Sequence, residues 1–263
     1  MSGRFVDDIR NCEFDQVLEN VRRLKPAGCR ILEIGAGTGL QARRFSEAGY
    51  SIDAIDLASS SYRDARVWPV VDYDGRHIPF PERSFDVVFS SSVLEHIPHL
   101  DEMQVEIARV LKDDGVAIHV VPGASWVLMS ALTHYPYLLK LVFQRLLAVL
   151  KRAARQNRPA DTPLQQQRPG RFTTPQLLMR VLMPPRHGER GIWLSEFWYF
   201  SKRIWIRSFI NSGWEIRDWQ PNGLCYSGNL ILGPRLGIGA RQRLGRLLFS
   251  VCHVFVLGKR AIS

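Results

Sequence analysis

The stretch Ile31–Gly39, with the sequence Ile-Leu-Glu-Ile-Gly-Ala-Gly-Thr-Gly, constrains the fold of this 263-residue chain most strongly. Its first four residues are mostly apolar and indicate a short, buried parallel strand. Three alternating glycines follow, and a helical pattern then runs from near Leu40 to Gly49, a typical C′ glycine. A strand, a glycine turn and a helix in this order bring backbone close to a nucleotide-like ligand. The alternative is an ordinary tight turn between a strand and a helix.

The spacing of the glycines separates two kinds of nucleotide site. The dinucleotide fingerprint G-x-G-x-x-G needs glycine or alanine at position 40, where this chain has Leu40. The chain has instead an acidic residue, Glu33, two positions before the first glycine. A second strand, predicted over Tyr50–Asp56, ends in an aspartate about 20 residues beyond that glycine. Its carboxylate can accept hydrogen bonds from both hydroxyls of a ribose, and a helix N-cap role is also open.

The pattern E-x-G-x-G-x-G resembles motif I of the class I S-adenosylmethionine (SAM) dependent methyltransferases. Val70–Phe89, with an Ile-Pro-Phe loop before Ser-Phe-Asp-Val-Val, and Val93–Ile97 are similar to later segments of that family. The resemblance runs from about Arg30 to Gly123 in order and spacing. It implies an α/β fold, a Rossmann-like, doubly wound seven-stranded sheet with an antiparallel last strand, here with a helical insertion after strand 5. It also implies SAM as the cofactor and methyl transfer to a small acceptor molecule.

The resemblance assigns cofactor binding to residues near the carboxyl ends of the predicted strands. Asp74 matches the family's adenine-contacting aspartate, Gly75 would offer its backbone N–H to the ring, and Asp72 is the alternative if the loop length differs. Ser90 and Ser91 end a further buried strand, where ligands of open parallel sheets bind. The predicted set is Glu33, Gly35, Ala36, Gly37, Gly39, Asp56, Leu57, Asp74, Gly75, Ser90 and Ser91.

Catalytic residues are harder to predict, because methyl transfer from a sulfonium needs mainly orientation and exclusion of water. For a hydroxyl acceptor a base would assist, and His96, after the fourth strand, is the first candidate. His187 and Glu196 are the alternatives. Glu95-His96 also resembles part of a metal-binding set in the ubiquinone-pathway O-methyltransferases, but Ser92 stands where that set has a further glutamate. The sequence therefore predicts no metal site.

The length fits one large α/β domain with added segments. Residues 153–170 are polar and indicate a linker, and the predicted antiparallel pair is Gly213–Trp219 with a strand around Leu230–Leu232. We expect four parts: a SAM-binding Rossmann-like core (1–123), a helical and linker insertion on the substrate side (124–198), the closing helix and strand pair of the core (199–234), and a basic, apolar C-terminal helix (235–263).

The formal net charge is +10, and much of the excess lies beside apolar segments. In Leu138–Arg155 the cationic and polar residues recur at intervals of three or four, which is typical of an amphipathic helix, and Pro136 argues against a membrane span. The apolar run Leu247–Leu257 has basic residues on both sides and is also too short to span a bilayer. We expect peripheral contact with an anionic membrane, with internal packing as the alternative. An acceptor that is a glycan or is linked to a lipid fits this expectation.

Other partners and compartments are less consistent with the sequence. A basic chain would suit nucleic acid, but amino-methylating enzymes of DNA and RNA usually carry Asn/Asp-Pro-Pro-Tyr/Phe where this chain has Ser90–Val93. A non-catalytic scaffold would need a damaged cofactor site, and the predicted site is intact. The four cysteines have no C-x-x-C spacing, and Met1–Asp8 is too polar for a signal peptide. We therefore expect a cytoplasmic protein, peripheral at the inner face of the membrane. The sequence does not predict the oligomeric state.

Overall fold

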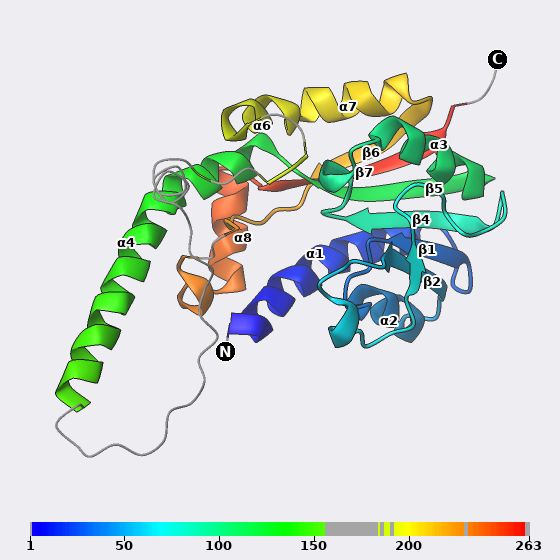
Figure 1. Cartoon of the computed structure of the whole chain (residues 1–263). Coiled ribbons are helices and arrows are strands. Elements are labelled where there is room, and N and C mark those ends of the chain that lie inside the picture. The colour runs from blue at the N-terminus through cyan, green and yellow to red at the C-terminus, as the bar shows by residue number, and fades with distance from the viewer. Residues whose placement is uncertain (1, 156–183, 185–186, 190–191, 229–230, 261–263) are drawn as a thin grey trace.

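A seven-stranded sheet with the order β3-β2-β1-β4-β5-β7-β6 organises the computed structural model, which describes residues 2–155, 184, 187–189, 192–228 and 231–260 (Figure 1). The first five strands pair in parallel, and the last strand, β7, runs antiparallel to both of its neighbours, β5 and β6, which confirms the predicted fold class. Strand order reverses between β1 and β4, so the ligand site of such a sheet is expected at this switch point. The strands are β1 (Arg30–Ile34), β2 (Ser51–Leu57), β3 (Val71–Tyr73), β4 (Phe85–Ser91), β5 (Leu111–Pro122), β6 (Trp214–Pro221) and β7 (Cys252–Lys259).

Helices cover both faces of the sheet because the central strands are apolar on both sides. α1 (Ser2–Leu24) and α2 (Leu40–Glu47) pack on one face, and α3 (Leu100–Val110) and α7 (Lys202–Asn211) on the other (Figure 1). On the first face the rings of Phe14 and Phe45 meet edge to face at 4.6 Å. On the second, the rings of Trp205 and Phe209 stack at 5.9 Å. The remaining helices are α4 (Ala124–Arg155), α6 (Trp193–Tyr199) and α8 (Ile238–Leu247), with short turns η1 (Arg63–Ala65), η2 (Leu94–His96) and η3 (Gly233–Arg235).

The apolar run Leu247–Leu257 is not the interfacial helix that its composition predicted. Its first residue ends α8, and most of the rest forms β7. β7 pairs with β5 on one side and β6 on the other, so Val254, Phe255 and Val256 are buried. Apolar runs of this length suit a helix or a buried strand equally, and the valines and phenylalanine favour the strand. The prediction of one helix over 235–263 is therefore wrong.

The position of the last strand was also predicted wrongly. β6 lies where Gly213–Trp219 predicted the penultimate strand, but its partner is β7. Of Leu230–Leu232, Leu230 lies outside the described residues, and Ile231 and Leu232 form a turn. The closing strand pair thus extends beyond the predicted 199–234 segment, because the chain passes through α8 before it returns to the sheet.

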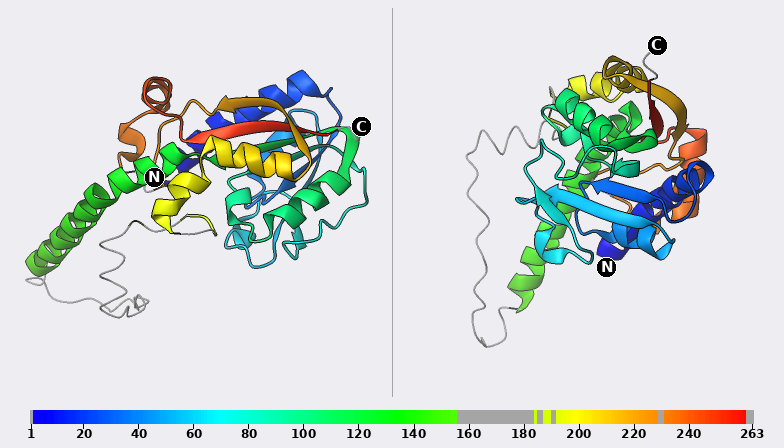
Figure 2. Two further views of the ribbon diagram at one scale, coloured as in Figure 1. Left: turned by 90° about the horizontal axis from the view of Figure 1, so that it is seen from above. Right: turned by 90° about the vertical axis from the view of Figure 1, so that its right-hand side faces the viewer.

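α4 begins directly after β5 and extends away from the body of the protein (Figures 1 and 2). It contains the predicted Leu138–Arg155 helix and continues through Pro136. Its first turns pack on the sheet, with Val127 buried, whereas residues 142–151 are exposed on all sides. Residues 153–155 of the predicted linker continue this helix, and residues 156–170 lie outside the described residues.

Candidate cofactor and acceptor site

The glycine turn after β1 is held against β2 by its own backbone. The N–H groups of Gly35 and Ala36 donate to the carbonyl of Ile55 at 2.9 and 3.0 Å. Gly35, Gly37 and Gly39 have φ angles of 71°, 55° and 76°, in the left-handed region that favours glycine. A Cβ on Gly35 would overlap the Val93 side chain. The turn therefore leaves backbone exposed at the switch point and has no room for a side chain at its first glycine.

Asp56 connects the end of β2 to this turn. Its Oδ2 accepts a hydrogen bond from the N–H of Gly37 at 3.1 Å, and its Oδ1 accepts one from the N–H of Leu57 at 2.9 Å. A carboxylate oxygen has two lone pairs, so each oxygen retains capacity for a ligand hydroxyl. Asp56 can thus order the turn and bind a diol at the same time.

A cavity of about 470 Å³ opens above the glycine turn. Six residues of the predicted cofactor set line it, and His96 lines it as well. Those six are Gly35, Gly37, Asp56, Leu57, Asp74 and Gly75. The other lining residues lie outside the predicted set, and they are Ser60, Tyr62, Tyr73, Arg76, Ser92, Val93, Ile97, Pro98 and His99. The cavity combines acidic, apolar and backbone groups, as a ligand with a ribose, an aromatic base and a charged end requires.

Asp74, and not the alternative Asp72, reaches this cavity. Asp72 forms ion pairs with Arg63 and Arg66 at 2.7 and 2.8 Å. Asp74 accepts hydrogen bonds from the His77 ring and from the backbone N–H groups of residues 76 and 77, all within 2.9 Å. These donors hold the pKa of Asp74 well below its usual range, so the carboxylate stays ionised.

The prediction for Ser90 and Ser91 is not supported by their positions. The Ser90 hydroxyl is buried and lies 2.8 Å from Nδ1 of His119, whose pKa burial lowers to about 3. The Ser91 hydroxyl is buried with no hydrogen-bond partner among the described residues, and neither serine lines the cavity. Side chains within a strand point into the layers beside the sheet, and the cavity starts one residue later, at Ser92. Ser92 has a φ of 55°.

Three further residues of the predicted set, Ala36, Gly39 and Glu33, do not line the cavity and belong to the structure around it. Ala36 is packed in the core, and Gly39 caps α2. Glu33 is buried, and burial raises its pKa to about 8, while a backbone hydrogen bond at Ala42 opposes this rise. Its Oε2 has no hydrogen-bond partner among the described residues. A carboxyl in this state would gain from an adjacent cationic group.

A second cavity, of about 210 Å³, adjoins the first through the shared residue Ser92. Arg10 from α1 is its permanently charged residue and donates to the Ser92 hydroxyl at 3.2 Å. The rest of the wall combines apolar, aromatic and polar residues from α1, the end of β5, the start of α4, the insertion, the segment before α8 and the start of β7. It consists of Val6, Ile9, Pro122, Trp126, His187, Tyr226, Ser227, Gly228 and Cys252.

Glu95, His96 and His187 meet at the boundary between the two cavities. Oε1 of Glu95 lies 3.9 Å from Nε2 of His96 and 3.6 Å from Nε2 of His187. His96 lines the first cavity and His187 the second. Spacing in the sequence could not reveal this group, because His187 is brought in from the insertion.

Glu196, the other alternative base, has a structural task in this arrangement. It is buried, and its Oε1 accepts hydrogen bonds from the N–H groups of His187 and Gly188, both at 2.7 Å. The next N–H, of Glu189, donates to the Glu95 carbonyl at 3.0 Å. Glu196 therefore fixes the turn that presents His187 and is not directed at either cavity.

Comparisons with known proteins support one family. Residues 32–119 match the family model described as a methyltransferase domain. The chain is 36% identical over 96 residues to malonyl-[acyl-carrier protein] O-methyltransferase of Geobacter sulfurreducens, covering 33% of this chain and 36% of that protein. It is 33% identical over 102 residues to ubiquinone biosynthesis O-methyltransferase of Xanthomonas axonopodis, covering 35% and 43%. The matched segment thus spans less than half of these relatives.

A solved SAM-dependent methyltransferase from Mesorhizobium loti shares the fold, with a TM-score of 0.51, 17% identity, and coverage of 92% of this chain and 96% of that one. The residues around the first cavity also fit SAM. Asp56 can hold the ribose, and among the described residues only Tyr62, at 3.5 Å, lies near the Cβ position of Gly37, which leaves the backbone there open to a ligand. The chain therefore carries a class I SAM-dependent methyltransferase domain.

Proposed function

We propose that this protein methylates a hydroxyl oxygen of a glycan, a lipid-linked intermediate or another small molecule, and that it works at the cytoplasmic face of a membrane. The observation that carries the proposal is the pair of cavities that meet at Ser92. The first suits the cofactor, and the second, lined by apolar, aromatic and polar side chains, is large enough for the reacting end of an acceptor. The relatives named above are O-methyltransferases, which supports an oxygen acceptor.

When bound, SAM supplies an activated methyl group whose bond to sulfur breaks as the bond to the acceptor oxygen forms. The protein has to align the acceptor, exclude water and receive the hydroxyl proton. His96 lies at the boundary of the two cavities and would take that proton. Trp126 and Tyr226 would bound the acceptor and keep water from it.

Methyl-labelled SAM and a fractionated cell extract test this function. We expect label to enter the lipid or glycan fraction, and the RNA fraction to stay unlabelled, because Ser90–Val93 differs from the loop typical of base-methylating enzymes. Label in RNA, or in no fraction at all, would contradict the proposal. Label confined to soluble metabolites would support the alternative acceptor, a free small molecule.

The membrane part of the proposal rests on α4. Leu139, Val142 and Phe143 are 71%, 65% and 60% exposed, and the cationic Lys140 and Arg145 lie among them. A soluble protein rarely exposes so continuous an apolar surface. Further exposed apolar residues of α4 are Leu132, Tyr135, Leu146, Leu147, Val149 and Leu150.

A lipid surface is the occupant that matches both features, since it offers an apolar layer beneath anionic headgroups. Near the start of α4, the Ser125 hydroxyl donates to the Ser250 carbonyl, which places the exposed Leu247, Leu248 and Phe249 beside it. Among the described residues, no helix combines the length and apolarity needed to cross a bilayer. Contact through α4 would therefore be peripheral.

We expect the protein to float with vesicles of an anionic phospholipid and to bind neutral vesicles more weakly. Salt should weaken the electrostatic part and leave a resistant fraction from apolar burial. Phe143→Asp should reduce binding by about tenfold or more, since burial of one large apolar side chain contributes roughly 1.5–3 kcal/mol.

Val105→Asp is the matched control, because Val105 is 66% exposed on α3, away from α4, and its replacement should leave flotation unchanged. If the unmodified protein stays in the soluble fraction with anionic vesicles at low salt, the membrane proposal fails. A soluble acceptor then becomes the better interpretation.

A further inference from the structure

We infer that Glu95, His96 and His187 form a binding site for a divalent metal ion. The three side chains come from two distant segments, and their ligand atoms all lie within 4.8 Å of one another. Two imidazoles and one carboxylate are a donor set that binds zinc and related transition ions in proteins.

The observation that most favours a cation site here is the environment of the Glu95 carboxylate. Its side chain is fully buried, and neither carboxylate oxygen has a hydrogen-bond partner among the described residues. A buried carboxylate without donors is costly, and a bound cation would remove that cost.

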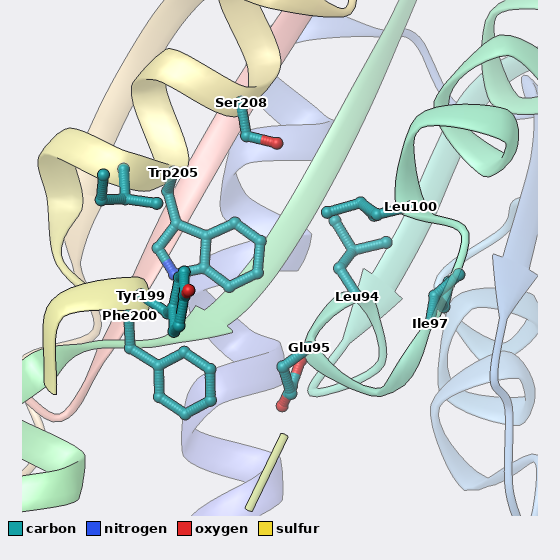
Figure 3. Close-up of a pocket in the computed structure, with 9 residues that line it drawn as sticks. Leu94, Glu95, Ile97, Leu100, Tyr199, Phe200, Trp205 and Ser208 are labelled. Atoms are coloured by element: carbon teal, nitrogen blue, oxygen red, sulfur yellow. The ribbon is translucent and has the colours of Figure 1, made fainter. Parts of the chain in front are cut away.

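Within the described part of the chain, Glu95 lacks hydrogen-bond donors because the residues packed beside it are mainly apolar. Its side chain borders a narrow cavity of about 40 Å³ lined mainly by apolar residues of η2, α6 and α7. Figure 3 shows Glu95 at one end of this gap, with the rings of Phe200 and Trp205 on the opposite wall. The Trp205 Nε1–H already donates to the Pro122 carbonyl at 3.0 Å, so it is not a donor for Glu95.

The distances between the Glu95 carboxylate and the two imidazoles are more consistent with ligands around one metal ion than with direct hydrogen bonds. The separations of 3.6 and 3.9 Å from Oε1 to the two imidazole nitrogens exceed hydrogen-bond length. Two ligands that each lie about 2.0–2.2 Å from a metal are separated by up to roughly 4 Å. An ion could therefore bridge both pairs with little movement.

The backbone holds the ligands in this arrangement. Glu196 fixes the turn at His187, and Glu189 joins that turn to the Glu95 carbonyl. A Cβ on Gly188 would lie 3.0 Å from the same carbonyl, so a glycine permits this close approach. The indole of Trp126 lies against the His187 ring, with centroids 4.0 Å apart. The site is thus pre-organised, as metal sites require.

Arg10 is a permanent cation near this group, but its guanidinium already has other partners. Its guanidinium pairs with Glu13 at 3.4 Å and donates to the Ser92 hydroxyl at 3.2 Å. It therefore leaves the carboxylate of Glu95 without a direct partner.

A metal here would change the role of His96. With the ion bound, His96 is a ligand and not the base. An ion held by Glu95, His96 and His187 would supply Lewis-acid polarisation of an acceptor oxygen at the boundary of the two cavities. The site itself does not depend on the proposed function, because metal binding can be measured without SAM or acceptor.

Calorimetry on the full chain, stripped with chelator and titrated with zinc chloride, tests the inference. We expect one saturable site with micromolar or tighter affinity. His187→Asn and Glu95→Gln should each weaken it at least about 100-fold, because even an outer-shell partner of a metal typically contributes 10–100-fold. Cobalt added in place of zinc should give visible absorption bands, and these should be lost in the same variants.

His99→Asn is the matched control for zinc binding, since His99 is an exposed histidine close to the group but outside it. Thermal unfolding without metal checks that each variant folds, and His96→Asn replaces Glu95→Gln if that variant does not. Absence of saturable zinc binding, or binding that survives in His187→Asn, would overturn the inference. SAM affinity of the unmodified protein, measured in the same instrument, shows separately whether the cofactor site is intact.

Discussion

Replacing Asp56 by alanine is expected to weaken SAM binding by about 100-fold to 10,000-fold. The substitution would remove the two charge-assisted hydrogen bonds to the ribose that we propose for this carboxylate, each contributing roughly 1.5–3 kcal/mol. It also removes the acceptor for the Gly37 N–H, which lies 3.1 Å from the carboxylate, so the glycine turn loses its connection to β2. Isothermal titration with SAM and with S-adenosylhomocysteine measures the loss.

Asp53→Ala is the matched control on the same strand. Asp53 forms an ion pair with Arg30 at 2.9 Å and does not line the cavity, so its removal should leave the affinity for SAM unchanged. Asp56→Asn keeps the shape and one acceptor oxygen, and it should fall between the unmodified protein and Asp56→Ala. Equal affinity in Asp56→Ala and the unmodified protein would show that this carboxylate does not bind the ribose.

Replacing Gly35 by valine should abolish SAM binding and also lower the free energy of unfolding. The left-handed φ of 71° costs a residue with a side chain about 1–2 kcal/mol. The new Cβ would also overlap Val93, whose short branched side chain cannot move aside without shifting the segment that carries His96. Chemical denaturation and SAM titration on the same sample measure both effects.

Two further variants separate overlap from backbone strain. Gly49 has a φ of 89°, and no atom of the described residues lies within 4 Å of the position that a Cβ would take there, so Gly49→Ala should cost stability but not SAM affinity. Adding Val93→Ala to Gly35→Ala should recover part of the lost stability, because it removes the overlapping methyl groups. If Gly35→Ala alone binds SAM as the unmodified protein does, close packing at this glycine is not required.

Local patterns were sufficient to predict several residues that the structure brings together around the glycine turn. The E-x-G-x-G-x-G stretch and Asp56 are close in sequence, so their geometry follows from one strand-turn-helix unit and the strand after it. The resemblance already favoured Asp74, and the structure separates it from the alternative Asp72, which is engaged in ion pairs with Arg63 and Arg66.

The acceptor side could not be predicted in the same way. The grouping of His187 with Glu95 depends on how the insertion folds back, and no spacing in the sequence encodes it. The identity of β7 was missed because an apolar run of this length has no periodicity that separates a helix from a strand buried on both faces. Ser90 and Ser91 were predicted in place of Ser92 because the sequence does not reveal where β4 ends, and serines inside the strand face the layers beside the sheet.

The position of β7 has a consequence for how the protein folds. The sheet acquires this interior strand only after α4, the insertion and α8 have been synthesised, and Cys252 must then pair with Pro122 from far earlier in the chain. Contacts of such long range slow folding. Until they form, the edge of β5 and the apolar surface of α4 are exposed together, a combination that favours aggregation. Deletion of the residues after Ser250 would therefore remove the strand that joins β6 to the rest of the sheet. The proposed binding of α4 to a lipid surface would cover the apolar residues of this helix until β7 has formed.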